Sequence, residues 1–248
     1  MYYETYGQGP PLLLIHGNGD SIAAMAHQIP YFAKHYRVIA ADSRGHGKSS
    51  LGTGKLTYVQ MMEDYNSLLD ELGVKNAFLI GWSDGGILTL LLAIHHPDKV
   101  GKAAVMGANL RPDADAVNDW VPGLLQPFSD FVDARIASHD TNENWALQRA
   151  LLDLLQDQPH ISDAELNTIK VPVLVMAGDK DIIRAEHTLE IFRNIPKAQM
   201  AILPGQTHWA PADDAGEFNA MVYRFFSTPF TRPTSEAILG KMLAVPED

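Results

Sequence analysis

The chain has 248 residues, of which 46% are hydrophobic and 20% charged, a composition that suits one large globular domain and excludes a disordered protein. Asp and Glu (30) outnumber Lys and Arg (19), so the formal net charge is −11, and the sequence has no basic cluster of the kind that binds nucleic acid. Because there is no cysteine, disulfides, thiolate metal sites and a cysteine nucleophile are excluded.

The first part of the chain alternates between short apolar runs, which predict strands, and amphipathic stretches, which predict helices. The predicted strands are residues 11–15, 37–41, 77–82 and 100–106, and the predicted helices are residues 22–36, 57–72 and 85–95. This alternation is typical of an α/β fold with a mostly parallel sheet and helices on both faces. Helix 85–95 is apolar nearly all round, so we expect it to be buried on several sides.

The alternation stops in the middle of the chain and then resumes. The middle has helix-like stretches at 128–138 and 145–156, and after it come strands 171–177 and 198–203 and helices 185–194, 212–226 and 236–243. We therefore predict a core domain, residues 1–109 and 168–248, interrupted by a helical lid, residues 110–167. The lid is expected to lie over the carboxyl edge of the sheet, where open α/β sheets bind ligands.

The strongest motif is GWSDGG at residues 81–86, between a predicted strand and a predicted helix. A Gly-x-Ser-x-Gly pentapeptide is common by chance, but between strand and helix it predicts a sharp turn that raises the Oγ of Ser83 above the sheet. Side chains at Gly81 and Gly85 would collide with neighbouring backbone. The N–H of Asp84, at the helix start, is then available to bind an oxyanion. We interpret Ser83 as a nucleophile rather than part of an ordinary turn.

A serine nucleophile needs a general base and an orienting carboxylate, and the chain supplies both downstream in the order Ser, Asp, His. Asp179 and Asp181 directly follow one late strand, and His208 follows the next. Because carboxyl ends of parallel strands meet at one edge, these side chains are expected near Ser83. His208 is the predicted base, and either aspartate fits the acid. The other nine histidines show no metal-ligand spacing.

Three segments resemble the α/β-hydrolase superfamily: LLLIHGNG at residues 12–19, DSRGHGKS at residues 42–49 and the GWSDGG motif. The resemblance extends from residue 3 to about residue 226. Members of that family usually have another strand before the stretch that corresponds to residues 2–6, so this chain begins abruptly by comparison. Whether a leader has been removed from the amino terminus therefore stays an open question.

The resemblance implies the α/β-hydrolase fold and assigns several roles. The backbone N–H of Asn18 would be the second oxyanion donor, beside that of Asp84. The family's acid usually lies three residues after the glycine of its loop, which favours Asp181 over Asp179. The insertion at residues 110–167 corresponds to the family's variable lid.

A narrower resemblance, to the biphenyl-hydrolase-like group that includes valacyclovir hydrolase, rests on GWSDGG, HHP at 95–97 and GAN at 107–109. In that group the acidic residue after the nucleophile helps to select esters with a free α-amino group, which would give Asp84 a role in substrate binding. The alternative is an acid that stabilises the first turn of a helix. The other expected substrate contacts are aromatic, with core packing as the alternative: Trp82, Trp120, Phe128, Trp145 and Trp209.

We therefore expect a serine hydrolase that cleaves a small-molecule carboxylic ester, including an α-amino acid ester, through a Ser83–His208–Asp181 triad and an acyl-enzyme. This chemistry needs no cofactor or metal. A C–C bond hydrolase, a thioesterase and a lactonase are alternatives on the same site, and a small-ligand receptor with slow or no turnover is an alternative of another class. We expect no nucleic-acid partner, no membrane span and a cytoplasmic location. The sequence does not set the oligomeric state.

The negative charge is concentrated in the predicted lid. Residues 110–165 contain eleven acidic residues and three arginines, a balance of −8. A solvated acidic surface is the simpler interpretation. If some of these carboxylates instead face the cleft, the site would attract cationic substrates and repel anionic ones.

Overall fold

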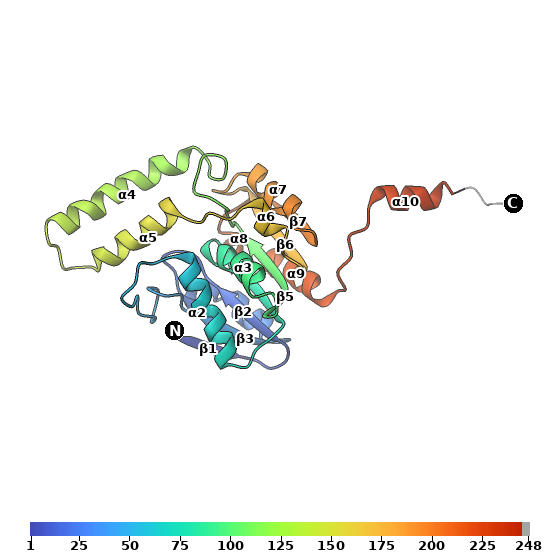
Figure 1. Ribbon diagram of the computed structural model, residues 1–248, viewed down its shortest axis with the longest axis horizontal. Helices are drawn as coiled ribbons and strands as arrows, with labels where there is room; N and C mark the ends of the chain where they lie inside the picture. Colours follow the sequence, from blue (N-terminus) through green and yellow to red (C-terminus); the bar gives the residue numbers. More distant parts are fainter. Residues whose placement is uncertain (245–248) are drawn as a thin grey trace.

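A seven-stranded sheet forms the centre of the computed structural model, which describes residues 1–244 (Figure 1). The strand order is β1-β3-β2-β4-β5-β6-β7; β1 is antiparallel to β3, and all other neighbours are parallel. The strands are β1 (Tyr3–Tyr6), β2 (Pro11–Ile15), β3 (Arg37–Ala41), β4 (Ala77–Trp82), β5 (Val100–Met106), β6 (Val173–Lys180) and β7 (Ala198–Thr207). The expected mostly parallel sheet is confirmed.

Helices cover both faces of this sheet. One face carries α2 (Tyr58–Glu71), α3 (Asp84–His95), α6 (Asp163–Leu166) and α7 (Ala185–Asn194). The other carries the 3-10 helix η1 (Ile22–Met25), α1 (Gln28–Phe32), α8 (Ala210–Asp213) and α9 (Ala215–Ser227). The last helix, α10 (Ser235–Met242), has no buried residue and lies apart from the sheet at the end of an extended segment (Figure 1).

The central strands are apolar on both faces because both are covered. In β2, Leu13 and Ile15 belong to one buried cluster, and Leu12 and Leu14 belong to the other. Helix α3 is buried at every position from Asp84 to Ala93, as its all-round apolar sequence predicted.

One predicted helix is wrong and several boundaries move. Residues 22–36 form η1 and α1 rather than one helix, because Pro30 has no N–H to donate to a preceding turn. The predicted helix 212–226 is divided at Asp214, whose side chain accepts a hydrogen bond from the Glu217 N–H and caps α9. Strands β6 and β7 extend to Lys180 and Thr207, which carries both strands further toward the sheet's carboxyl edge.

Helices α4 (Trp120–Ala137), α5 (Trp145–Asp157) and α6 lie between β5 and β6 in the chain, and α4 and α5 run side by side (Figure 1). Helix α4 begins eight residues before its predicted start; Pro122 falls in its first turn, where the missing N–H costs no helical hydrogen bond. Helix α5 lies against loops that follow β2 and β3: the Leu151 carbonyl accepts a hydrogen bond from Asn18 Nδ2, and a β carbon on Gly45 would be 3.1 Å from the Leu147 side chain. Among residues 1–244, no helix combines the length and apolarity that crossing a membrane requires.

Candidate active site

Ser83 occupies the turn between β4 and α3 with φ = 57° and ψ = −119°, a strained backbone conformation for a residue other than glycine. Its N–H donates to the Met106 carbonyl on β5 (2.8 Å), which holds the turn against the sheet. Two glycines make space: a β carbon on Gly81 would overlap the Gly85 carbonyl, and one on Gly85 would overlap the Ile15 carbonyl. The sharp turn that the motif predicted is present.

The loop after β2 lies against this serine. A β carbon on Gly17 would be 3.2 Å from the Cβ of Ser83 and 3.8 Å from its Oγ. His16 fixes the loop: its Nε2 accepts a hydrogen bond from the Ser43 N–H (3.0 Å), so its Nδ1 carries the proton and donates to the Gly17 carbonyl (2.7 Å). Burial lowers the pKa of His16 from 6.5 to about 4, which keeps this ring neutral.

Two backbone N–H groups next to Ser83 lack an acceptor. Asn18 follows Gly17 in the loop, and Asp84 is the first residue of α3, where an N–H has no partner within the helix. Among the hydrogen bonds described for residues 1–244, neither of these two N–H groups is a donor. The positive end of the α3 dipole lies at the same place. The structure thus leaves free the two donors that the sequence assigned to an oxyanion.

His208 and Asp181 form a buried pair at the ends of β7 and β6. His208 Nδ1 and Asp181 Oδ1 are 2.7 Å apart, and the two residues are 4% exposed. The carboxylate also accepts hydrogen bonds from the Gly178 and Ile183 N–H groups. Since a carboxylate can only accept, Nδ1 is the donor and Nε2 of the neutral ring is left as a base.

Asp179 lies away from this pair. It is exposed, and its Oδ2 accepts a hydrogen bond from the Gly205 N–H (3.0 Å). Of the two aspartates considered from the sequence, the structure brings Asp181 to His208. Gly107 is a further neighbour that the sequence reasoning did not single out as a site residue. It has φ = +63°, and a β carbon there would be 2.6 Å from His208 Nδ1. The position of a glycine directly after a buried strand was the signal available.

Ser83 and His208 line one cavity of about 320 Å³. Most of its wall is apolar, and α4 supplies a large share of it. The lining residues are Gly17, Asn18, Asp20, Trp82, Ser83, Trp120, Val121, Leu124, Leu125, Leu155, Ile182, His208 and Trp209. Three of the five aromatic residues expected at the substrate are therefore here, namely Trp82, Trp120 and Trp209. The aliphatic residues were missed because helical spacing does not reveal which side of an inserted helix faces the site.

The other three expected substrate contacts are not in this cavity. Phe128 stacks with Phe131 at a centroid distance of 6.4 Å, two turns and about 12 Å along α4 from Trp120. Trp145 packs edge-on against Phe131, and its Nε1 donates to Asp140 (3.1 Å). The carboxylate of Asp84 is buried and is hydrogen-bonded within the protein.

The charge of the cavity wall differs from the acidic composition of the insertion. Asp20 is the one lining side chain with a formal charge, and no Lys or Arg of residues 1–244 lines the cavity. None of the eleven acidic residues of the insertion lines it either. Several are paired with arginine elsewhere: Asp113 with Arg111, Asp119 with Arg184, Asp140 with Arg135, and Asp153 with Arg149. The structure favours the interpretation of a solvated acidic surface.

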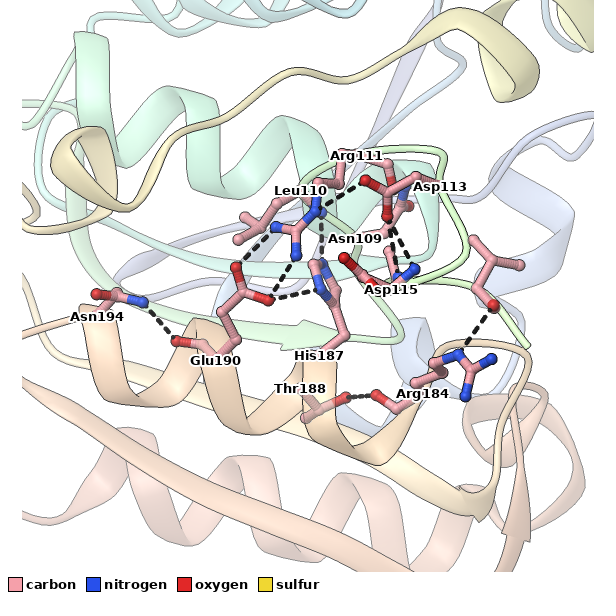
Figure 2. Close-up of polar contacts among 12 residues, drawn as sticks. Asn109, Leu110, Arg111, Asp113, Asp115, Arg184, His187, Thr188, Glu190 and Asn194 are labelled. Carbon is pink, nitrogen blue, oxygen red and sulfur yellow. Dashed lines mark hydrogen bonds and ion pairs between the residues drawn. The ribbon is translucent and has the colours of Figure 1, made fainter. Parts of the chain in front are cut away.

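The start of the insertion is fixed to α7 by buried and partly buried polar contacts (Figure 2). The Leu110 N–H donates to His187 Nε2 (2.9 Å), and His187 Nδ1 donates to Glu190 (3.0 Å). Figure 2 shows Glu190 between His187 and Arg111, which binds both carboxylate oxygens at 2.7 and 2.9 Å. Burial lowers the pKa of His187, which favours the neutral acceptor form.

The insertion also contacts the loop that carries Asp181. Asn118 donates from its side chain to the Asp181 carbonyl (2.9 Å) and from its backbone to the Ile182 carbonyl (3.0 Å). The Arg184 N–H donates to the Ala116 carbonyl (2.9 Å). No group of three or more His, Asp or Glu side chains in the part of the chain described is placed to hold a metal ion.

The fold, the strained serine turn and the His–Asp pair define a class of protein, and comparison with known proteins agrees. The chain belongs to the alpha/beta hydrolase fold family, whose model matches residues 10–144. It is 32% identical to 3-oxoadipate enol-lactonase 2 of Acinetobacter baylyi, over 73% of this chain and 76% of that protein. It is 26% identical to a 2-hydroxy-6-oxononadienedioate/2-hydroxy-6-oxononatrienedioate hydrolase of Burkholderia vietnamiensis, over 91% of this chain and 90% of that one.

Among solved structures, the chain is similar to a bromoperoxidase from Bacillus anthracis. The TM-score is 0.75 at 25% identity, over 92% of this chain and 95% of the other. These relatives have different activities, so membership of the family sets the fold and leaves the substrate to the residues around the site.

Proposed function

We propose that this protein is a serine hydrolase that cleaves an uncharged carboxylic ester or lactone through an acyl-enzyme. The observation that carries the proposal is the 2.7 Å hydrogen bond between Asp181 and His208, with His208 and the strained Ser83 in the walls of one cavity. A serine is a poor nucleophile until a base removes its proton, and this arrangement provides a base with a fixed tautomer.

In the proposed reaction His208 Nε2 takes the proton of Ser83 as its Oγ attacks the acyl carbon. Asp181 holds the Nδ1–H and stabilises the imidazolium that forms. The N–H groups of Asn18 and Asp84 bind the oxyanion, and a donor of this kind contributes about 3 kcal/mol. His208 then protonates the leaving alkoxide, and a water molecule activated by the same ring hydrolyses the acyl-enzyme.

The helical insertion, residues 110–167, is proposed as a lid that sets the substrate. Helix α4 contributes Trp120, Val121, Leu124 and Leu125 to the cavity wall, so a change in this helix changes the walls and leaves the proposed triad intact. Apolar walls gain roughly 25 cal/mol for each Å² of apolar substrate surface that they cover. A small, apolar acyl or alkyl group is therefore the expected occupant.

The absence of Lys and Arg from the lining described bears on the alternatives. The Burkholderia vietnamiensis relative is named for a dienedioate, which carries two carboxylates. A buried carboxylate needs a cationic or hydrogen-bonding partner, because desolvation without one is costly. The cavity has no cationic partner and one acid, Asp20, so a C–C hydrolase for anionic ring-cleavage products is disfavoured relative to hydrolysis of a neutral ester or lactone.

The proposal is tested with the Ser83→Ala variant and a substrate panel of neutral alkyl esters, lactones, thioesters and α-amino esters. Wild-type protein should hydrolyse short p-nitrophenyl esters, and a fluorophosphonate probe should add to one serine by intact mass; both should be lost in Ser83→Ala with the thermal unfolding temperature retained. Turnover retained in the variant would remove Ser83 from its role. Ligand-induced stabilisation without turnover of any panel member would favour the receptor alternative.

A further inference from the structure

The carboxylate of Asp84 is placed for contacts inside the protein. Asp84 is 2% exposed and does not line the cavity, although its neighbour Ser83 does. A negative side chain at the first position of α3 gains from the helix dipole. A buried carboxylate is nevertheless costly unless hydrogen bonds satisfy it, so its partners show what keeps it there.

Both oxygens of this carboxylate accept hydrogen bonds from distant parts of the chain. Tyr58, at the start of α2, donates its hydroxyl to Oδ1 at 2.7 Å. Asn18 donates Nδ2 to Oδ2 at 3.0 Å. The same Nδ2 donates to the Leu151 carbonyl of α5 at 3.3 Å. Asn18 is therefore held from one side by the nucleophile turn and from the other by the insertion.

We propose that the Asp84 carboxylate is a positioning group that fixes Asn18, and with it the backbone N–H that binds the oxyanion, and that it does not select substrates by their charge. This inference rests on the proposed function. His16 holds the Gly17 carbonyl of the loop after β2, but the Asn18 backbone takes part in none of the hydrogen bonds described for residues 1–244 and is followed by Gly19 with φ = +71°, so it lacks a restraint of its own. The Asn18 side chain supplies one, and a displaced donor loses stabilisation of the transition state.

Charge selection is assigned elsewhere by the same geometry. Asp20 is the acidic side chain in the cavity wall, so an ammonium group on a substrate meets Asp20 there. Positioning of the oxyanion donor is therefore assigned to Asp84, at the start of α3, and selection of substrate charge to Asp20, in the loop after β2. The Asp84→Asn and Asp20→Asn variants remove the same charge from a buried and an exposed site respectively, and are a matched pair.

The decisive experiment is a double-mutant cycle on Asn18→Ala and Asp84→Ala, with kcat and KM measured for a neutral ester and for its α-amino analogue. Asn18→Ala keeps the backbone N–H and loses only the side chain. Each single variant should lower kcat by about 10- to 100-fold with little change in KM, equally for both esters. Because both act through one hydrogen bond, the double variant should be little worse than either single one.

Three further measurements make the result unambiguous. Tyr58→Phe removes one of the two hydrogen bonds and should lower kcat less than Asp84→Asn does. Asp130→Asn, an exposed acid on α4 whose partner is Gln126, should match wild type. The affinity of a phosphonate that mimics the tetrahedral intermediate should fall in proportion to kcat/KM while KM stays unchanged, whereas a loss confined to substrate binding would raise KM and leave kcat unchanged.

Losses that multiply in the double variant, or a loss confined to α-amino esters, would overturn the positioning role. The cycle is also run on the free energy of unfolding, which needs no activity. A wild-type protein without turnover would contradict the proposed function. Non-additive free energies of unfolding for the Asn18 and Asp84 variants would then still support the contact between these side chains, and additive free energies would refute that contact.

Discussion

Gly107 lies directly against the imidazole of His208: a β carbon at this position would be 2.6 Å from both Nδ1 and Cε1. It would also be 3.5 Å from Oδ2 of Asp181. The backbone of Gly107 has φ = +63°, where a side chain adds about 1 kcal/mol of strain. The glycine that directly follows β5 therefore provides the space in which the His–Asp pair forms.

Gly107→Ala is expected to lower kcat/KM for esters by about 100-fold or more, because the ring must move away from its place beside Asp181. Steady-state kinetics and thermal unfolding of the variant check this. Gly216→Ala is the control, since a β carbon on that helical glycine of α9 meets nothing within 4 Å; it should keep full activity and gain about 0.5 kcal/mol of stability. Equal activity of the two variants would show that His208 tolerates the added methyl group.

Asp181→Asn should reduce kcat by about 10⁴-fold, since the amide cannot hold the Nδ1–H tautomer as a carboxylate does. Asp179→Asn should reduce it less than threefold, because that side chain bonds the exposed Gly205 N–H and does not contact His208. Both variants carry the same Asp-to-Asn change, at positions two residues apart. Pre-steady-state burst kinetics therefore compares the effect of the two positions on the rate directly. The reverse order would move the acid to Asp179.

The sequence predicted the sheet well because buried strands are apolar on both faces, and their runs stand out. It placed Ser83, Asp179, Asp181 and His208 at one edge of the sheet because each follows one of these strands, and the family resemblance then favoured Asp181 over Asp179. The helix at 22–36 failed on a single residue, Pro30, whose effect on the hydrogen bonds outweighs the apolar spacing.

The direction of a side chain was harder to predict than its place in the fold. A resemblance to one group of the family gave Asp84 a role at the substrate, with stabilisation of the α3 start as the alternative. Its partners are 26 and 66 residues away along the chain, at Tyr58 and Asn18. Phe128 and Trp145 were expected there because they are aromatic and lie in the insertion. Which turn of α4 faces the cavity depends on how α4 packs on α5 and the core, and residue spacing within one helix does not contain that information.

The free energy of unfolding should decrease as the pH is lowered from about 6.5 to about 4, because of His16. Burial lowers the pKa of this ring in the folded protein to about 4, while the unfolded chain keeps the ordinary 6.5. The unfolded state therefore binds more protons within this window, and the free energy of unfolding decreases as the pH is lowered, by about 3 kcal/mol for this group across the whole window. The lowered pKa of His187 acts in the same direction.

Urea unfolding at several pH values between 7.5 and 4 measures this dependence, and the variant His16→Asn isolates the contribution of the ring. The variant is expected to be less stable at pH 7.5, since it loses the acceptor for the Ser43 N–H, and to show a shallower decrease toward pH 4. The contributions of the carboxylates are expected to be the same in wild type and in His16→Asn, so they cancel when the two pH profiles are subtracted. Parallel profiles for wild type and variant would refute the assignment to His16.

A substitution at Leu124 should change the charge of the cavity without disturbing the core, because this residue lines the cavity and is 69% exposed. Leu124→Arg adds the cation that the lining described lacks, and an exposed ion pair contributes up to about 1 kcal/mol. The variant should therefore raise kcat/KM about threefold for an ester with a terminal carboxylate on its acyl chain, and lower it for the matching ammonium ester. Leu124→Gln removes the same apolar surface without adding charge and should weaken both esters alike. If the two variants gave the same ratio of carboxylate to ammonium ester, the charge of the lining would not determine the choice of substrate.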